Sequence, residues 1–248
     1  MPKVMIVTGA SRGIGAAIAQ LAAQRGYAVC INYARNRAAA DAVAQTIARA
    51  GGKAITVQAD VARQAEAAKL FEEVDRQLGA VDVLMNNAGI IGDHFTIDQT
   101  DEAALQHIFA TNTFSCFFCA GEAIKRMSTR LGGKGGVIVN ISSVAARHGG
   151  LPKEIAYAAS KGAVDSFTFG LAKEVAREGI RVNALRPGLI ATDMHDAHGG
   201  SAMLASLGPT VPLGRAGSAE EVAEVALWLA SPAASYVHGT VVDVSGGR

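Results

Sequence analysis

The stretch from Ser143 to Lys161 contains a tyrosine and a lysine whose spacing could do acid–base chemistry. Tyr157 and Lys161 lie in an Ala-rich segment, and if that segment is a helix, both side chains leave the same face one turn apart. A free tyrosine titrates near ~10, so lowering its pKa to ~7 requires roughly 4 kcal/mol, whereas an exposed ion pair supplies only about 0–1 kcal/mol. The pair therefore needs a dry cleft and a second positive charge. Without them, Tyr157 and Lys161 are a solvated pair on a helix surface.

Two other clusters carry groups that could exchange electrons or bind a metal. Cys116 and Cys119 have the spacing of a redox pair, but they lie inside a predicted helix among phenylalanines instead of opening a helix after a strand. We therefore expect inert thiols in the core. His195 and His198 lack further ligands of matching spacing, so we expect no metal site and interpret their segment as a loop near the substrate.

Composition limits the class of protein. At 248 residues and 50% hydrophobic content, the chain is long enough for one large core, so we expect a single domain over residues 1–248. The net charge of +1 argues against nucleic acid and membrane surfaces as partners. An odd number of cysteines, three, and an N-terminus without signal-peptide layout predict a reducing compartment, by default the cytoplasm.

Short apolar runs alternate with helical patterns along the whole chain. Strands that read as continuous apolar runs, each followed by a helix, predict an α/β fold with a parallel sheet covered on both faces. The predicted strands are 4–8, 27–33, 54–58, 81–86, 136–141, 180–185 and 240–244, and the predicted helices are 13–25, 36–50, 63–78, 101–130, 157–178 and 218–230. Residues 188–215 are interpreted as a loop with a short helix, bordering the substrate.

A glycine-rich turn joins the first strand to the first helix. In this turn, Gly9 permits the tight bend, Gly13 lets the backbone approach a pyrophosphate, and Gly15 lets the helix pack close to the sheet. The free N–H groups of the helix N-terminus attract phosphates. In this strand–turn–helix context we favour dinucleotide binding over a plain turn.

Charge at the end of the second strand indicates which dinucleotide is bound. An NAD site usually places Asp or Glu there, but residues 30–40 contain no acid and instead contain Arg35 and Arg37. A guanidinium favours a 2′-phosphate, so we predict NADP(H), held by Arg12 and Arg35. The alternative is that Arg35 and Arg37 only solvate the start of the second helix.

With these motifs in order, the chain closely resembles the short-chain dehydrogenase/reductase family, including its 3-oxoacyl-ACP reductase-like and glucose dehydrogenase-like members, over essentially all 248 residues. The matching segments are 8–15, the pair 60–61, 86–89, and 186–192, together with Asn112, Ser143, Tyr157 and Lys161 at the four catalytic positions. The resemblance implies a Rossmann-type doubly wound sheet of about seven parallel strands with helices on both faces.

The resemblance also implies a mechanism and a set of contacts. It implies that hydride moves between nicotinamide and a carbonyl carbon while Tyr157 gives or takes the proton of the oxygen. Lys161 would lower the Tyr157 pKa and bind the nicotinamide ribose. Ser143 would hold the carbonyl oxygen, and Asn112 would anchor a water chain. Ser142 is the alternative to Ser143, because the interval to Tyr157 is one residue longer than in many members, an excess that we place in residues 149–154. The implied cofactor contacts are Gly9, Ser11, Arg12, Gly13, Ile14, Gly15, Ala34, Arg35, Asp60, Val61, Asn87, Ala88, Gly89, Tyr157, Lys161, Pro187, Gly188, Ile190 and Thr192.

The substrate and the assembly stay open at this point. The predicted substrate pocket comprises 90–95, 144–155 and 189–213, including Ile90, His94, Val144, His148, Met194, His195 and Met203, and it would accept a 3-oxoacyl thioester, a steroid-like ketone or a sugar. Small residues on the Tyr157 helix favour close packing across a subunit interface, so the resemblance implies a homotetramer, with a dimer as the alternative. A non-catalytic NADP(H)-binding sensor or scaffold, and an NAD-dependent alcohol or sugar dehydrogenase, are the alternative functions.

Overall fold

The computed structural model describes residues 2–192 and 200–248. Within these residues the strands form a seven-stranded sheet in the order β3-β2-β1-β4-β5-β6-β7, with every neighbouring pair parallel. The strands are β1 Val4–Val7, β2 Ala28–Tyr33, β3 Lys53–Gln58, β4 Val83–Asn86, β5 Gly136–Ile141, β6 Ile180–Pro187 and β7 Val241–Val244. The parallel α/β fold expected from the sequence is confirmed.

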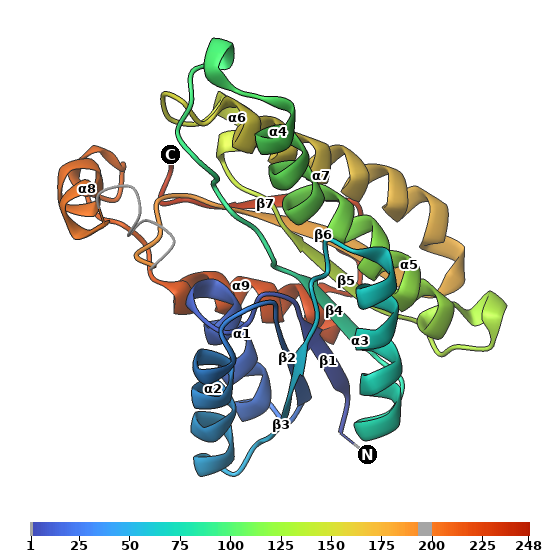
Figure 1. Ribbon diagram of the computed structural model, residues 1–248. Coiled ribbons are helices and arrows are strands. Elements are labelled where there is room, and N and C mark those ends of the chain that lie inside the picture. Colours follow the sequence, from blue (N-terminus) through green and yellow to red (C-terminus); the bar gives the residue numbers. More distant parts are fainter. Residues whose placement is uncertain (1, 193–199) are drawn as a thin grey trace.

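Helices cover both faces of the sheet (Figure 1). They are α1 Gly13–Gln24, α2 Arg37–Arg49, α3 Gln64–Gln77, α4 Glu102–Phe109, α5 Ser115–Met127, α6 Ala145–His148, α7 Ile155–Val175, α8 Gly200–Leu207 and α9 Ala219–Ala230. Short 3-10 turns lie at Ile97–Gln99, Thr129–Leu131, Ala176–Glu178, Gly208–Thr210 and Pro232–Ala234. One core packs α1, α2 and α9 against the sheet, and the other packs α3, α5 and α7 against the opposite face.

Burial on both faces explains the apolar strands. All residues of β1, β2 and β4 are buried, whereas the edge strand β3 is partly exposed. From β1 the chain proceeds outward to β3 and then returns to the other side of β1 with β4. Such a reversal leaves a crevice beyond the carboxyl ends of the two central strands, which is where ligands bind in open α/β sheets.

Helix ends follow their sequence signals. The expected capping box is present at α9, where the Ser218 hydroxyl accepts from Glu221 N at 3.3 Å and the Glu221 carboxylate accepts from Ser218 N at 2.8 Å. The short helix expected after β6 is α8. The long helix expected over residues 101–130 is wrong in detail, because a π-helical turn, Ala110–Phe114, separates α4 from α5.

The cysteines are buried and free, as expected. Burial raises the pKa of the Cys116 thiol to about 11, and it raises the thiol pKa of Cys30 and Cys119 as well. Thiolates are the reactive form of cysteine, so these three side chains are inert packing residues. Among the described residues, none of the helices is both long and apolar enough to cross a bilayer.

Candidate active site

A cleft of about 530 Å³ opens at the carboxyl ends of the central strands. Its lining runs from the turn after β1 and the end of β2, past the segment after β4, to the turn after β5, the first turns of α7 and the segment after β6. Residues far apart in the sequence meet there because parallel strands all end at the same edge of the sheet.

The glycine turn is shaped by close contact with the segment after β4. Gly9 has a φ of +62°, and a Cβ on it would lie 2.9 Å from Ala88 Cα, so no other residue fits. The side-chain amide of Asn87 donates from Nδ2 to the backbone carbonyl oxygens of Thr8 at 2.9 Å and Gly9 at 3.1 Å. In return, the Thr8 hydroxyl accepts from the backbone N–H groups of Asn87 and Ala88. These bonds hold the turn in place and leave the first N–H groups of α1 available to a phosphate.

Two arginines border this end of the cleft. Arg12 and Arg35 are exposed and line the cleft, and no ion pair of either guanidinium is found within the described residues. Arg37 behaves differently, because its Nε lies 3.4 Å from the Asp41 carboxylate one turn along α2. The solvating role considered for both Arg35 and Arg37 therefore fits Arg37, whereas Arg35 is free to meet a phosphate.

Tyr157 and Lys161, the pair expected to be catalytic, both lie in α7. Tyr157 and Lys161 are one turn apart in α7, and both line the cleft. The Lys161 ammonium is buried and donates to Ile141 O at 2.7 Å, with its Nζ 6.0 Å from the centroid of the Tyr157 ring. The Lys161 ammonium is therefore hydrogen-bonded to the last residue of β5 rather than to the tyrosine hydroxyl.

The two serines after β5 have different partners. Ser143 forms a hydrogen bond with the Tyr157 hydroxyl, and its own oxygen accepts from Ala145 N at 3.1 Å. Ser142 instead donates to Lys161 O at 3.1 Å. The geometry thus favours Ser143 over Ser142 as the serine that contacts a bound carbonyl oxygen.

In the chain alone, the Tyr157 hydroxyl is less acidic than that of a free tyrosine. Its pKa is raised to about 12, chiefly by burial; the hydrogen bond with Ser143 acts to lower the pKa, and the Glu154 carboxylate acts to raise it. Burial also lowers the pKa of Lys161, against the charge of Asp165. The lowering of the Tyr157 pKa by Lys161 that the resemblance implies therefore stays a prediction for the protein with bound cofactor, because in the chain alone the ammonium donates to Ile141 O.

Asn112 is buried in the π-helical turn and holds two parts of the site together. Its Oδ1 accepts from Ile90 N at 2.8 Å, and its Nδ2 donates to Ile90 O and to Ser160 Oγ, each at 2.9 Å. A Cβ on Gly89 would lie 3.2 Å from Lys161 Nζ and 3.3 Å from Asn112 Oδ1, so this glycine makes room for both groups. Asn112 does not line the cleft in the described part of the chain, and its role with water stays a prediction.

All expected cofactor contacts line the cleft except Val61. The Asp60 carboxylate borders the cleft and accepts from Ala62 N at 3.2 Å, whereas the Val61 side chain is buried in the core with α3. A contact from Val61 can come only from its backbone.

The substrate end agrees in part with the expectation. Ile90, Val144, His148 and Met203 line the cleft, whereas His94 is not one of its lining residues and has its Nε2 3.4 Å from the Glu154 carboxylate. Met194 and His195 lie outside the described residues. Lining residues that the sequence did not single out include His107, Thr111 and Arg248. A helical spacing of four places His107 and Thr111 on one face, a signal that the expected uninterrupted helix could have shown.

Metal ligation has no support in residues 2–192 and 200–248, where no group of three or more His, Cys, Asp or Glu side chains is placed to hold an ion. His198, like His195, falls outside these ranges.

Comparison with known proteins agrees with this geometry. The family model described as Enoyl-(Acyl carrier protein) reductase matches residues 9–248. The Uncharacterized oxidoreductase YgfF from Escherichia coli is 44% identical over 245 residues, covering 99% of both proteins. A 3-oxoacyl-(acyl-carrier-protein) reductase from Synechocystis sp. is 42% identical over 246 residues, covering 99% of this chain and 96% of that protein. A solved short-chain dehydrogenase/reductase from Serratia marcescens has a TM-score of 0.91 at 33% identity, covering 99% of this chain and 97% of that chain. The chain therefore belongs to the short-chain dehydrogenase/reductase family of oxidoreductases.

Proposed function

We propose that the protein is an NADP(H)-dependent oxidoreductase that transfers hydride between nicotinamide and a carbonyl or secondary alcohol, with Tyr157 as general acid and base. One observation carries the proposal: a single cleft is lined by the glycine turn at one end and by Ser143 and Tyr157 at the other. A dinucleotide bound by its phosphates at the turn therefore has a protein proton donor at its far end.

The residues present fit the phosphorylated cofactor. The glycine turn admits a pyrophosphate, and Arg12 and Arg35 offer two guanidinium groups where β2 ends without a carboxylate. Asp60 borders the same end, where the resemblance implies contact with the adenine. The bound cofactor supplies or accepts the hydride.

The protein's own residues would handle the proton. In the reductive direction, Tyr157 donates its hydroxyl proton to the substrate oxygen, and the Ser143 hydroxyl bonds to that oxygen and stabilises the developing charge. Lys161 would bind the nicotinamide ribose, for which it must exchange part of its bonding to Ile141 O. Asn112 keeps α4, α7 and the segment after β4 in register through its bonds to Ile90 and Ser160.

The surface of α5 and α7 supports the proposed homotetramer. Phe117 of α5 and Phe169 of α7 are exposed, as is Phe114 at the end of the π-helical turn that precedes α5. Large apolar side chains exposed together on a surface favour an interface. A Cβ on Gly162 or Gly170 would meet nothing within 4 Å in this chain, so neither glycine serves packing within the subunit. Close approach of a second subunit would account for both. The buried free thiols support a reducing compartment such as the cytoplasm.

The test is NADPH oxidation by the wild-type protein with a panel of carbonyl compounds. The panel includes a 3-oxoacyl thioester, which the name of the Synechocystis relative suggests, together with a steroid-like ketone and a sugar. Tyr157→Phe should lower turnover at least about 100-fold, since general acid catalysis contributes about 10²–10⁴. The affinity for NADPH should stay within about twofold, because the substitution removes only a hydroxyl. A variant that keeps a tenth or more of the wild-type rate would rule out Tyr157 as the proton donor.

A further inference from the structure

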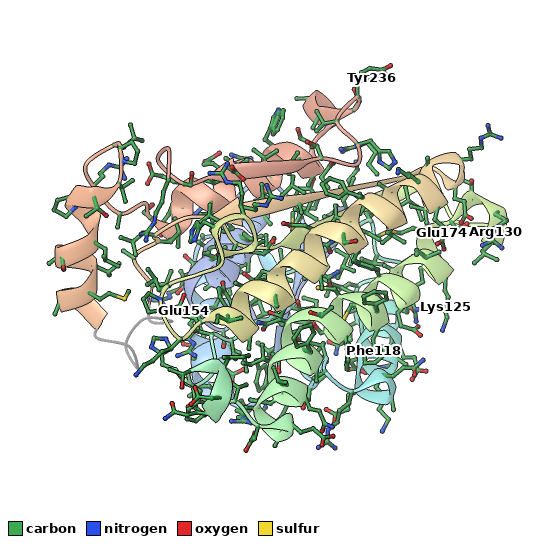
Figure 2. All side chains as sticks on the ribbon, turned by 90° about the horizontal axis from the view of Figure 1, so that it is seen from above. Phe118, Lys125, Arg130, Glu154, Glu174 and Tyr236 are labelled. Carbon is green, nitrogen blue, oxygen red and sulfur yellow. The ribbon has the colours of Figure 1, made fainter. Side chains whose placement is uncertain are left out.

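A carboxylate lies in the cleft wall, three residues before Tyr157. Glu154 is 8% exposed and lines the cleft, although its neighbours Lys153 and Ile155 are exposed. Figure 2 labels Glu154 where the ribbon of α7 begins. A glutamate that directly precedes a helix is ordinarily exposed to solvent. The burial of Glu154 in the cleft wall therefore needs a structural explanation, and it raises the question of what the carboxylate does there.

The cause is the loop that precedes α7. Lys153 has a φ of +71°, the one positive φ among the described residues other than glycine, and Gly149 and Gly150 also adopt positive φ values. The loop is closed by two bonds, from Glu154 N to Leu151 O and from Leu151 N to the Glu154 Oε2, each at 3.0 Å. Strained backbone persists only where its surroundings enforce it, and it concentrates at functional sites. Here the strain turns the Glu154 side chain inward.

The carboxylate retains capacity for a ligand. Oε2 accepts from Leu151 N, and Oε1 lies 3.4 Å from His94 Nε2, which reaches it from the segment after β4. A carboxylate has about four acceptor positions, so these two partners leave room for a donor from the cleft. His107, His148 and Arg248 also line the cleft.

The charge of Glu154 disfavours ionisation of the Tyr157 hydroxyl. This charge raises the pKa of Tyr157. The carboxylate is therefore close enough to the hydroxyl to interact with whatever binds there. A group that is buried, held by a strained loop and unfavourable to the phenolate fits a role in choosing the substrate.

We propose that Glu154, oriented by Leu151 and His94, is a specificity-determining residue that selects carbonyl substrates with a hydroxyl or ammonium donor beside the carbonyl and rejects those with a carboxylate or phosphate there. This inference rests on the proposed oxidoreductase function. It narrows the substrate class to carbonyl compounds that are neutral or cationic next to the reacting carbonyl, and it sets no condition on charges farther along the substrate.

Two matched pairs of small substrates test the inference. Acetoacetate and its methyl ester differ in charge next to the ketone, and hydroxyacetone and butanone differ by a hydroxyl in place of a methyl. Wild type should prefer the methyl ester over acetoacetate at least about tenfold in kcat/KM, as expected for like charges a few ångströms apart in a cleft. It should also prefer hydroxyacetone over butanone.

Glu154→Gln is the variant to compare, because it keeps the shape and removes the charge. In this variant, the preference for the methyl ester over acetoacetate and the preference for hydroxyacetone over butanone should each fall at least about fivefold. The first preference should fall because the variant turns over acetoacetate faster than wild type does. Glu72→Gln, an equal change of charge on the exposed surface of α3, should leave both ratios as in wild type. Thermal melting and NADPH affinity of each variant establish that it is folded.

The outcomes separate this inference from the proposed function. Equal ratios in wild type and Glu154→Gln, or a wild-type preference for acetoacetate, would overturn the role of Glu154 while leaving the oxidoreductase intact. Where turnover of these compounds is too slow, the same ratios are measured as binding to the NADPH-loaded protein and decide the question in the same way. Absence of NADPH oxidation with the full carbonyl panel would count against the proposed function itself.

Discussion

Arg186 joins the structural elements around the cleft, and its removal gives the sharpest prediction on stability. Its Nε and Nη2 donate to the same oxygen of Asp165, at 2.9 and 2.8 Å, and its Nη1 lies 3.4 Å from the Asp243 carboxylate. Arg147 donates to the other oxygen of Asp243 at 2.6 Å. Asp165 lies one turn after Lys161, and Arg186 directly precedes Pro187, so the network connects α7, β6, β7 and α6.

The magnitude follows from burial. The side chains of Asp165 and Arg186 are 8% and 19% exposed, and the second oxygen of Asp165 is buried and has no hydrogen-bond partner among residues 2–192 and 200–248. Arg186→Met would leave the carboxylate without its two charged bonds. Breaking a buried pair in this way costs about 3–5 kcal/mol, and the partial exposure of the arginine places the loss near about 3 kcal/mol. For a chain of this size, that corresponds to a fall in Tm of roughly 6–12 °C.

A second substitution distinguishes the pair from simple loss of packing. Replacing a whole buried pair by apolar residues is often neutral, so Asp165→Leu together with Arg186→Met should recover most of the lost stability. Arg177→Met, at an exposed position after α7, is the control and should leave Tm unchanged within about 2 °C.

Thermal melting followed by circular dichroism at one protein concentration measures all four proteins, because assembly makes Tm depend on concentration. An Arg186→Met protein that melts within about 2 °C of wild type would refute the reasoning, as would a double variant less stable than the single one.

Two further predictions concern the cofactor and the phenol. Arg35→Asp should reduce the preference for NADPH over NADH at least about tenfold, because a carboxylate would replace a cation beside the 2′-phosphate. Arg37→Asp is the control and should leave this preference nearly unchanged. Equal effects of the two substitutions would contradict the role of Arg35 in binding the 2′-phosphate. The Tyr157 pKa, measured as phenolate absorbance of wild type minus Tyr157→Phe, should be about 12 without cofactor and should fall when the oxidised cofactor binds. A value at or below the ordinary ~10 in the cofactor-free protein would show that burial does not dominate.

Most of the fold could be predicted because the signals were local. Continuous apolar runs marked the strands, and Gly51 and Gly79 marked the ends of the helices that precede β3 and β4. The π-helical turn could not be predicted in the same way, since its residues continue the helical pattern of α4 and α5. Its cause is tertiary: the Asn112 side chain bonds to Ile90 and Ser160, which lie in other segments, and the extra residue in the turn allows it to reach both.

The gathering of most candidate site residues at one cleft could be predicted for a similar reason. The glycine turn, Ser143, Tyr157 and Lys161 carry recognisable types at fixed spacing, and parallel strands bring them to one edge of the sheet. Glu154 gave no such signal. In the sequence it is one carboxylate in the loop expected before the Tyr157 helix, within the range 144–155 assigned to the substrate pocket. It lies beside Lys153, whose φ is positive, and its carboxylate is 3.4 Å from His94, sixty residues away in the chain.

The acidity of Tyr157 bears on the direction of the proposed reaction. A pKa of about 12 rather than ~10 corresponds to roughly 3 kcal/mol in favour of the protonated phenol. A protonated phenol is the form that reduction needs, because it donates to the oxygen as hydride reaches the carbonyl carbon. Oxidation needs the phenolate first, and in the chain alone burial and Glu154 oppose it while Lys161 is held at Ile141. In the chain alone, burial and Glu154 thus favour the protonated phenol, and the oxidative direction would draw on the positive charge of the bound oxidised cofactor to offset that difference.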